Sequence, residues 1–257
     1  MTSRLTIEYD GTAFSGWAVQ PGERTIQGEL EAALATVLRR PVALTVAGRT
    51  DAGVHAWAQV ASHAGEPAPL GGLNALLGAD VTVLASGPAP EGFDARHDCT
   101  SRSYCYRVVA RPARLAIDRG HALHWGYPVD VAALHACAAL LVGTHDFTAF
   151  TPTDTYHVRF DRDVYAAYWR EGADGLLEFW IEADTFMRHM NRTLVGTMLD
   201  VARGRFSVAD FTRLLGGAAR TAAGPTAPAH ALYFAGAGYG GERLLTQRCS
   251  GSSEMGP

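Results

Sequence analysis

The chain has 257 residues, enough for one large domain or two small ones. Its 47% hydrophobic and 19% charged residues are typical of a globular protein with a sizeable core. All 22 basic residues are arginine, and 26 acidic residues give a net charge of -4, which argues against a protein that coats nucleic acid through bulk charge. The lack of lysine excludes a Schiff-base lysine, a Ser–Lys dyad and a phosphate-loop lysine.

The cysteines and the N-terminus indicate the compartment. None of the four cysteines forms a C-x-x-C pair, which argues against a thiolate zinc site or a redox motif. The first ten residues lack the apolar segment of a signal peptide, and no apolar run approaches the roughly 18 residues of a membrane span. We expect a cytoplasmic protein with no membrane association, whose cysteines are reduced.

Hydrophobic periodicity and turn residues predict the elements of the first third of the chain. In chain order these are a strand at 4–9, a helix from 25 to about 39, strands at 42–46 and 57–62, a helix at 70–77 and an extended segment at 81–85. Thr25 is a suitable N-cap for the first helix, and Pro41 ends it. The Pro/Gly-rich residues 87–92 are the best candidate for a linker.

The rest of the chain mixes strands and helices without regular βαβ alternation, which favours an α+β fold. The predicted elements are a strand at 101–109, a helix at 131–142, a hairpin of 158–169 with 176–183, helices at 185–203 and 207–215, and a strand at 231–235. We therefore expect an N-terminal α+β lobe (1–95), a C-terminal α+β lobe (96–235) and a mobile tail (236–257).

The most informative segment is residues 48–56, G-R-T-D-A-G-V-H-A, a Gly-flanked loop between two predicted strands. Such a loop can hold one carboxylate away from the sheet and let a ligand approach the backbone closely. Asp51 would be that carboxylate, with Arg49 two residues before it. The alternative is a simple turn, because aspartate is a common Asx-turn residue.

A second segment places Arg102, Tyr104 and Tyr106 on one face of a strand. An arginine beside aromatic rings suits a protein that binds flipped or single-stranded bases, although a core strand with buried tyrosines fits the pattern too. Arginines outnumber acidic residues between 96 and 119, so this neighbourhood is locally basic on an acidic chain.

The long predicted helix contains Arg192 on a stripe that becomes apolar along its length. A half-buried arginine usually has a carboxylate partner. The alternative is an exposed arginine whose stem covers apolar surface.

Together these segments resemble the TruA family of tRNA pseudouridine synthases, in the same order from about residue 4 to 235. The matching motifs are Y-D-G (9–11), G-W (16–17), T-I-Q-G (25–28), the loop 48–56, F-D-A-R (93–96), R-x-Y-x-Y (102–106), G-T-H-D-F (143–147), M-x-R with V-G (190–196), and T-A-P through Leu232 (226–232). The resemblance implies the pseudouridine synthase fold: two lobes of mixed, mainly antiparallel sheet flanked by helices, with a cleft between them.

The resemblance also implies roles for residues. Asp51 would be the essential catalytic carboxylate, Tyr104 would stack on the target uracil, and Arg192 would pair with Asp51. The substrate-binding residues would be Leu232, packed against the base, and three arginines: Arg49, Arg96 and Arg102. The family works on uridines 38, 39 and 40 of the tRNA anticodon stem-loop, as a homodimer, with no metal or organic cofactor.

Several positions depart from the family pattern, and none of them removes a proposed catalytic group. They are Ala18, Gly78, Asn191, Ala231 and Phe234.

Two rival functions stay open. One is a non-catalytic RNA-binding or folding-helper protein on the same scaffold, and the other is a metal-dependent hydrolase that uses His121, His124 and an acidic residue. His135 or His145 could join the first two histidines as a further metal ligand. The attack by Asp51 on C1′ or on C6, or its removal of a proton, also stays open.

Overall fold

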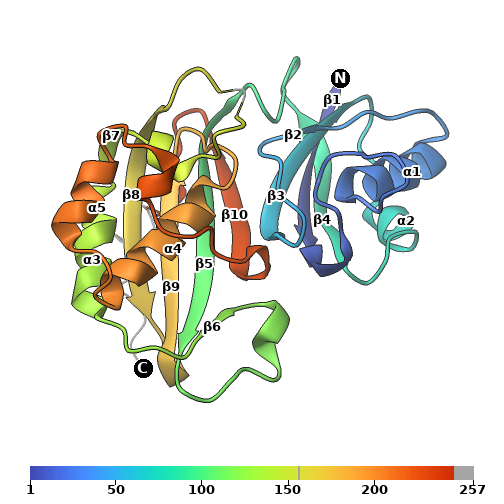
Figure 1. Cartoon of the computed structure of the whole chain (residues 1–257). Coiled ribbons are helices and arrows are strands. Elements are labelled where there is room, and N and C mark those ends of the chain that lie inside the picture. The colour runs from blue at the N-terminus through green and yellow to red at the C-terminus, as the bar shows by residue number, and fades with distance from the viewer. Residues whose placement is uncertain (156, 246–257) are drawn as a thin grey trace, which may run out of the picture. The chain divides into compact units, whose positions relative to one another are not determined.

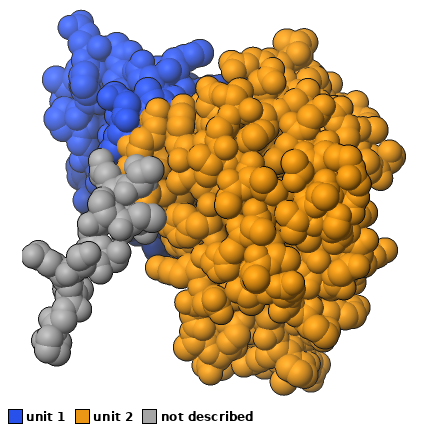
Figure 2. Space-filling view, turned by 90° about the vertical axis from the view of Figure 1, so that its left-hand side faces the viewer, with its two compact units in different colours: residues 1–102, 233–242 blue, residues 103–232, 243–257 orange. Residues whose placement is uncertain are grey.

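The computed structural model describes residues 1–155 and 157–245 (Figure 1). It divides into two compact units, coloured separately in Figure 2. Unit 1 comprises 1–102 and 233–242, and unit 2 comprises 103–232 and the chain from 243 onward. Within the described residues, no helix is long and apolar enough to cross a membrane.

Unit 1 contains a sheet in the order β4-β1-β3-β10. Its strands are β1 (Thr2–Tyr9), β2 (Thr45–Val46), β3 (His55–Ala64), β4 (Val81–Ala89) and most of β10 (Leu232–Tyr239). Strand β1 pairs antiparallel with both β3 and β4, β2 pairs antiparallel with β3, and β10 runs parallel to β3. The last of these pairings brings the C-terminal part of the chain beside the strand that follows the loop 48–56.

Two helices of unit 1 lie together on one side of its sheet, α1 (Ile26–Leu38) and α2 (Leu70–Asn74) (Figure 1). The predicted N-cap is confirmed, because the Thr25 hydroxyl accepts a hydrogen bond from the Gly28 N–H at 3.3 Å. Ile26, Leu30 and Leu34 of α1 are buried at helical spacing and belong to the unit's apolar core.

Unit 2 contains strands in the order β5-β9-β8-β7. These are β5 (Cys99–Ala110), which begins in unit 1, with β9 (Leu176–Ala183), β8 (Asp161–Glu171) and β7 (Gly143–Asp146). The short β6 (Leu123–Trp125) pairs parallel with β5. Three helices cover one face of this sheet, α3 (Val131–Leu140), α4 (Met190–Ala202) and α5 (Val208–Leu214) (Figure 1). Single 3-10 turns occur at Gly11–Ala13, Asp118–Gly120, Thr148–Phe150, Ala173–Gly175, Arg220–Ala222 and Ala229–Ala231.

The structure confirms the α+β class and moves several predicted boundaries. Residues 87–89 belong to β4 rather than to a linker, and the long helix begins at Met190 instead of 185. The division between the units falls inside β5 after Arg102, not after residue 95. Tyr233–Glu242 return to unit 1, so residues 236–239 of the predicted tail are part of β10.

The described cysteines are free and buried: Cys99, Cys105 and Cys137. Cys249 lies outside the described residues. Burial raises the pKa of all three thiols, which opposes thiolate formation at neutral pH.

One glycine of unit 2 gives a direct test of how closely its segments pack. Gly196 lies inside α4, and a Cβ there would meet the Pro225 carbonyl oxygen at 1.9 Å. We expect Gly196→Ala to lower the free energy of unfolding by at least the ~1–3 kcal/mol typical of overpacking. The measurement is chemical denaturation followed by circular dichroism.

Gly71 of α2 is the matched control, because a Cβ at that position meets nothing within 4 Å. Gly71→Ala should be neutral or stabilising by up to ~1 kcal/mol, since alanine favours helix more than glycine. Equal effects of the two substitutions would contradict the packing of residue 225 against α4.

Candidate active site

The loop between β2 and β3, residues 47–54, carries two of the predicted site residues and is called the signature loop below. Thr50 and Val54 are buried, whereas Arg49 is exposed and Asp51 is partly exposed. The Val54 N–H donates to the Asp51 carbonyl oxygen at 3.2 Å and closes a tight turn. Gly53 has a φ of 76° in this turn, a value that glycine adopts without strain. The loop therefore leaves Arg49 and Asp51 accessible, while the buried residues Thr50 and Val54 anchor it to the unit.

The segment that follows β1 holds the signature loop by close backbone contact. The Trp17 N–H donates to the Thr50 carbonyl oxygen at 3.0 Å. A Cβ at Gly11 would lie 2.0 Å from the Val54 carbonyl oxygen, so only glycine fits there. Gly16 has a φ of 95°, and a Cβ on it would lie 3.0 Å from the Thr50 carbonyl oxygen. The glycines of Y-D-G and G-W are thus required because a side chain at either position would separate the segment after β1 from the signature loop.

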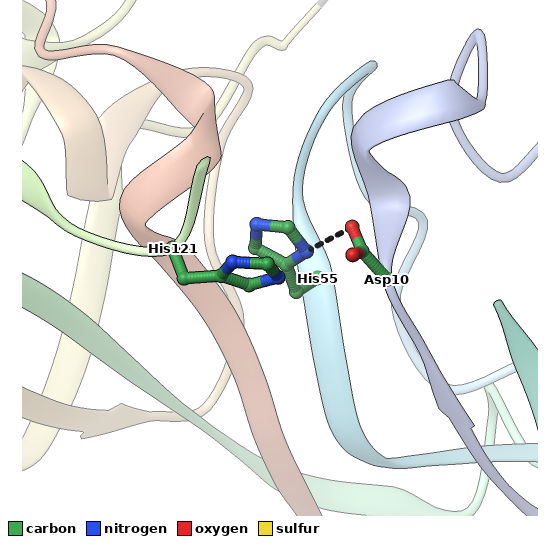
Figure 3. Close-up of side chains that lie close together, drawn as sticks. All are labelled: Asp10, His55 and His121. Carbon is green, nitrogen blue, oxygen red and sulfur yellow. Dashed lines mark ion pairs between the residues drawn. The ribbon is translucent and has the colours of Figure 1, made fainter. Parts of the chain in front are cut away.

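His55 and Asp10 meet at the end of the signature loop (Figure 3). His55 begins β3 and is 1% exposed. Its Nδ1 accepts a hydrogen bond from the Gly11 N–H at 3.0 Å and lies 3.1 Å from an Asp10 carboxylate oxygen. The His55 ring stacks on Tyr233 of β10, with centroids 4.8 Å apart. The sequence reading missed this role of His55, although the residue lies inside the matched loop motif.

Arg102 donates hydrogen bonds to three backbone carbonyls of unit 1. Its Nε bonds to Ala47 at 3.0 Å, its Nη1 to Cys99 at 2.9 Å and its Nη2 to Arg96 at 2.9 Å. Ala47 is the first residue of the signature loop, so Arg102 connects the loop to the turn at 94–98. Arg96 itself is exposed. Arg102 therefore has a structural role, in which it connects the signature loop to the turn at 94–98. The resemblance implies a substrate contact for the same residue.

Tyr104, Arg192 and Leu232 belong to unit 2. Tyr104 is 8% exposed, and its ring meets Phe186 edge-on with centroids 5.0 Å apart. Arg192 lies in the first turn of α4, and its Nε donates to the Ala227 carbonyl oxygen at 2.7 Å. The predicted pairing of Arg192 with Asp51 joins residues of different units and stays a prediction.

The T-A-P segment is fastened to α4 and β5 within unit 2. The Ala227 N–H donates to the Arg192 carbonyl oxygen at 3.0 Å, which reciprocates the bond from the Arg192 side chain. The Tyr106 hydroxyl donates to the Pro228 carbonyl oxygen at 2.9 Å. Both bonds hold the segment just before Leu232, which is buried. This part of unit 2 therefore positions Arg192 and Leu232 together.

The histidines of the hydrolase alternative have separate partners. His124 Nε2 lies 2.9 Å from the Arg111 carbonyl oxygen, His145 Nε2 lies 3.2 Å from that of Val142, and His135 lies 3.9 Å from Glu171. Among the residues of unit 2 that the structure describes, no three metal-ligating side chains converge. Within this unit, His124, His135 and His145 therefore do not form one ligand set.

A family model described as tRNA pseudouridine synthase matches residues 5–77 and 137–240, more than half of the chain. The chain belongs to this family. Both matched segments contain site residues named above, with Asp51 in the first and Arg192 and Leu232 in the second. The resemblance drawn from the motifs is thereby confirmed.

Relatives in several bacterial lineages carry the name tRNA pseudouridine synthase A. The one from Frankia casuarinae is 44% identical over 241 residues, covering 89% of this chain and 86% of its own. The one from Chromobacterium violaceum is 40% identical and covers 97% of both chains. The one from Bacillus pumilus is 37% identical, covering 91% of this chain and 97% of its own. The crystal structure of a Cbf5-Nop10-Gar1 complex is a more distant match, with 12% identity, a TM-score of 0.34 and coverage of 77% of this chain and 53% of that one.

Half-buried His230 lies two residues before Leu232, and we expect its protonation to destabilise unit 2. Burial lowers its pKa from the usual 6.5, and the nearby charges of His121 and Arg192 lower it further, against a backbone contact at Ala122 that raises it. The unfolded chain therefore binds the proton first as the pH falls, and stability decreases below about pH 6.5. We expect the melting temperature to fall less for His230→Gln than for the wild type when the pH is lowered from 7.5 to 5.0.

Thermal denaturation across this pH range measures the difference. His97 is a matched control, because it is an exposed histidine of unit 1. His97→Gln should follow the wild-type curve. A His230→Gln curve parallel to that of the wild type would contradict the lowered pKa.

Proposed function

We propose that the protein isomerises uridine to pseudouridine in the anticodon stem-loop of tRNA, at positions 38, 39 and 40, with Asp51 as the essential catalytic carboxylate. The observation that carries this proposal is the construction of the signature loop. Buried anchors at Thr50 and Val54 flank an accessible aspartate, in a chain that belongs to the tRNA pseudouridine synthase family. We further propose that the enzyme is a cytoplasmic homodimer that needs no metal or organic cofactor.

The reaction exchanges one glycosidic bond for another within the same nucleotide. The N1–C1′ bond breaks, the uracil turns in the site, a C5–C1′ bond forms, C5 loses its proton and N1 gains one. The base must first leave the RNA stack, which costs a few kcal/mol. The Tyr104 ring and the Leu232 side chain offset this cost by offering the base an apolar slot.

The carboxylate of Asp51 acts on the uridine by attack on C1′ or C6, or by removing a proton. Arg192 pairs with this carboxylate and keeps it charged when the substrate excludes water. A closed site also protects the cleaved sugar from hydrolysis. Arg49 and Arg96 are exposed, which suits contacts with the RNA.

A basic arm provides a surface for the tRNA backbone. The arm, residues 111–122, connects the end of β5 to β6, which pairs parallel with the end of β5. Residues 111–119 are exposed apart from partly buried Leu115. The segment carries Arg111, Arg114 and Arg119 against one acidic residue, Asp118. A local positive charge of this kind binds phosphates even though the whole chain has a charge of -4.

The arm belongs to the same unit as the base-binding residues and is connected to them. His230 contacts the backbone of Ala122 at the foot of the arm, and the charges of Arg192 and His121 act on its ring. His124, just beyond the arm, bonds to the Arg111 carbonyl oxygen. These contacts support a phosphate-binding role for the arm beside the proposed site of base capture.

The first test of the proposed function is Asp51→Asn. This substitution removes the carboxylate charge at nearly constant volume, so we expect a folded protein that makes no pseudouridine. The assay is tritium release from tRNA labelled at C5 of uridine, with circular dichroism to confirm folding.

Glu66→Gln is the control, because Glu66 is an exposed acid of unit 1 and loses the same charge. It should retain wild-type turnover. Turnover by Asp51→Asn would refute the catalytic assignment. A wild-type protein that binds tRNA but releases no tritium would favour the non-catalytic RNA-binding alternative.

The second test concerns the arm. Arg114→Gln combined with Arg119→Gln should weaken tRNA binding and flatten its salt dependence, because each lost phosphate contact reduces the slope of log K against log salt by about 0.7–0.9. Filter binding at several salt concentrations measures the slope.

Arg213→Gln is the control, since Arg213 is an exposed arginine of α5 that pairs with Asp210. Its slope should equal that of the wild type. An unchanged slope in the double variant would exclude the arm from the RNA interface.

A further inference from the structure

Three polar side chains meet in the interior of unit 1 beneath the signature loop. Tyr9 ends β1 and is 3% exposed, Thr50 belongs to the loop and is 8% exposed, and Gln59 lies in β3 and is 0% exposed. Their surroundings in β1 and β3 are largely apolar, including buried Ile7, Val60 and Ala61. Polar groups in such a place destabilise the fold unless each one has a partner.

Each polar group of this set has a partner. The Gln59 Nε2 donates to the Gly48 carbonyl oxygen at 2.8 Å and to the Tyr9 hydroxyl oxygen at 3.4 Å, while its Oε1 accepts from the Val60 N–H at 3.1 Å. The Tyr9 and Thr50 hydroxyl oxygens lie 2.7 Å apart. The Tyr9 and Thr50 hydroxyl groups can each donate or accept in this bond. The set therefore connects Gln59 through Tyr9 to Thr50 in one continuous series of hydrogen bonds.

The tyrosine keeps its proton under all ordinary assay conditions. Burial raises the Tyr9 pKa to about 12, against smaller lowering effects of the bonds to Thr50 and Gln59. The Tyr9 hydroxyl therefore stays protonated, and its hydrogen bond to Thr50 persists between pH 6 and 10.

The chain of hydrogen bonds fixes the signature loop on both sides of Arg49. Gln59 holds the backbone of Gly48, and Tyr9 holds the side chain of Thr50. The Trp17 N–H holds the Thr50 carbonyl, which belongs to the peptide bond leading directly to Asp51. Thr50 is thus anchored by side chain and backbone at once, one residue before the carboxylate.

We propose that Tyr9, Thr50 and Gln59 are positioning residues that set the place and direction of the Asp51 carboxylate for the isomerisation. This inference rests on the proposed function of Asp51. None of the three is proposed to touch the uridine. Apolar residues of similar shape would fill the same space, so the polar set contributes orientation more than stability. An error of about 1 Å in the place of a reacting group can cost roughly 100-fold in rate.

Two sets of variants test the inference. Tyr9→Phe removes one oxygen and keeps the ring packed against Trp17, whose ring centroid lies 6.1 Å away. Thr50→Ala and Thr50→Ser differ from each other only by the hydroxyl. We expect Tyr9→Phe and Thr50→Ala to lower kcat for tRNA about 10- to 100-fold, with KM within about two-fold of the wild type. Thr50→Ser, which keeps the hydroxyl, should recover most of the lost kcat.

Tyr239→Phe is the matched control. It removes a tyrosine hydroxyl in the same unit that donates to the Ala95 carbonyl oxygen at 2.8 Å, in the turn at 94–98 rather than in the signature loop. Its kcat should stay within two-fold of the wild type. All variants are assayed at one temperature that lies at least 15 °C below the lowest of their melting temperatures, so that a change in stability alone does not lower the rate.

The double variant Tyr9→Phe/Thr50→Ala separates positioning from independent damage. Both changes break the same bond, so the double variant should be no slower than the worse single variant by more than about two-fold. Multiplied losses would overturn the proposal. It would also be overturned if Tyr9→Phe matched Tyr239→Phe in kcat, or if Thr50→Ser were as slow as Thr50→Ala.

Wild type and Asp51→Asn are assayed beside these variants. An active wild type and an inactive Asp51→Asn, together with an unaffected Tyr9→Phe, would refute the positioning role and leave the proposed function intact. An Asp51→Asn variant that still releases tritium would instead refute the function on which the inference rests.

Discussion

The close contact between the segment after β1 and the signature loop is the constraint on which the rest of unit 1 depends. At Gly11 the two backbones approach so closely that a Cβ would lie 2.0 Å from the Val54 carbonyl oxygen. Such an approach is possible only with glycine, and it brings the backbone N–H groups of this segment within bonding distance of the loop. The loop is buried at Thr50 and at Val54, and the residues between them are accessible. Asp51 lies in the accessible part of the loop, between the buried residues Thr50 and Val54.

The two units hold their site residues by the same physical means. In unit 1, backbone carbonyls of the signature loop are bonded by the side chains of Arg102 and Gln59. In unit 2, Arg192 and Ala227 exchange two hydrogen bonds between α4 and the T-A-P segment. In each case a polar side chain from a regular element holds an irregular segment. Loops that carry function are commonly positioned in this way by a rigid scaffold.

The local distribution of charge matters more for binding a polyanion than the net charge of the chain. The net charge of -4 describes the whole molecule, but a polyanion is attracted by the surface that it approaches. The exposed arm between β5 and β6 concentrates three arginines. Arginine suits such a surface because its planar guanidinium binds phosphate through two hydrogen bonds and stacks on bases.

Elements with a strong local signal were predicted well. The N-cap at Thr25, the apolar stripe of α1 and the hairpin of β8 with β9 follow from residues that are neighbours in the sequence. The strand predicted at 42–46 is shortened to the two residues of β2, while the short β6 and β7 were not predicted, because strands of three or four residues are defined by their pairing with other strands. Residues 185–189 have helical spacing but lie outside α4, and His189 has a φ of 62°, which no helix interior permits.

The sequence by itself determined the family, the α+β class and the aspartate that carries the proposed chemistry, because these are properties of short motifs in a fixed order. Only the tertiary structure decided which polar residues hold that aspartate. Tyr9 lies about forty residues before Thr50, and in the sequence Tyr9 and Gln59 read as ordinary strand positions. Their hydrogen bonds exist because β1, β3 and the signature loop are brought together by folding. A partner for a buried polar group is a property of three-dimensional proximity, which no local pattern encodes.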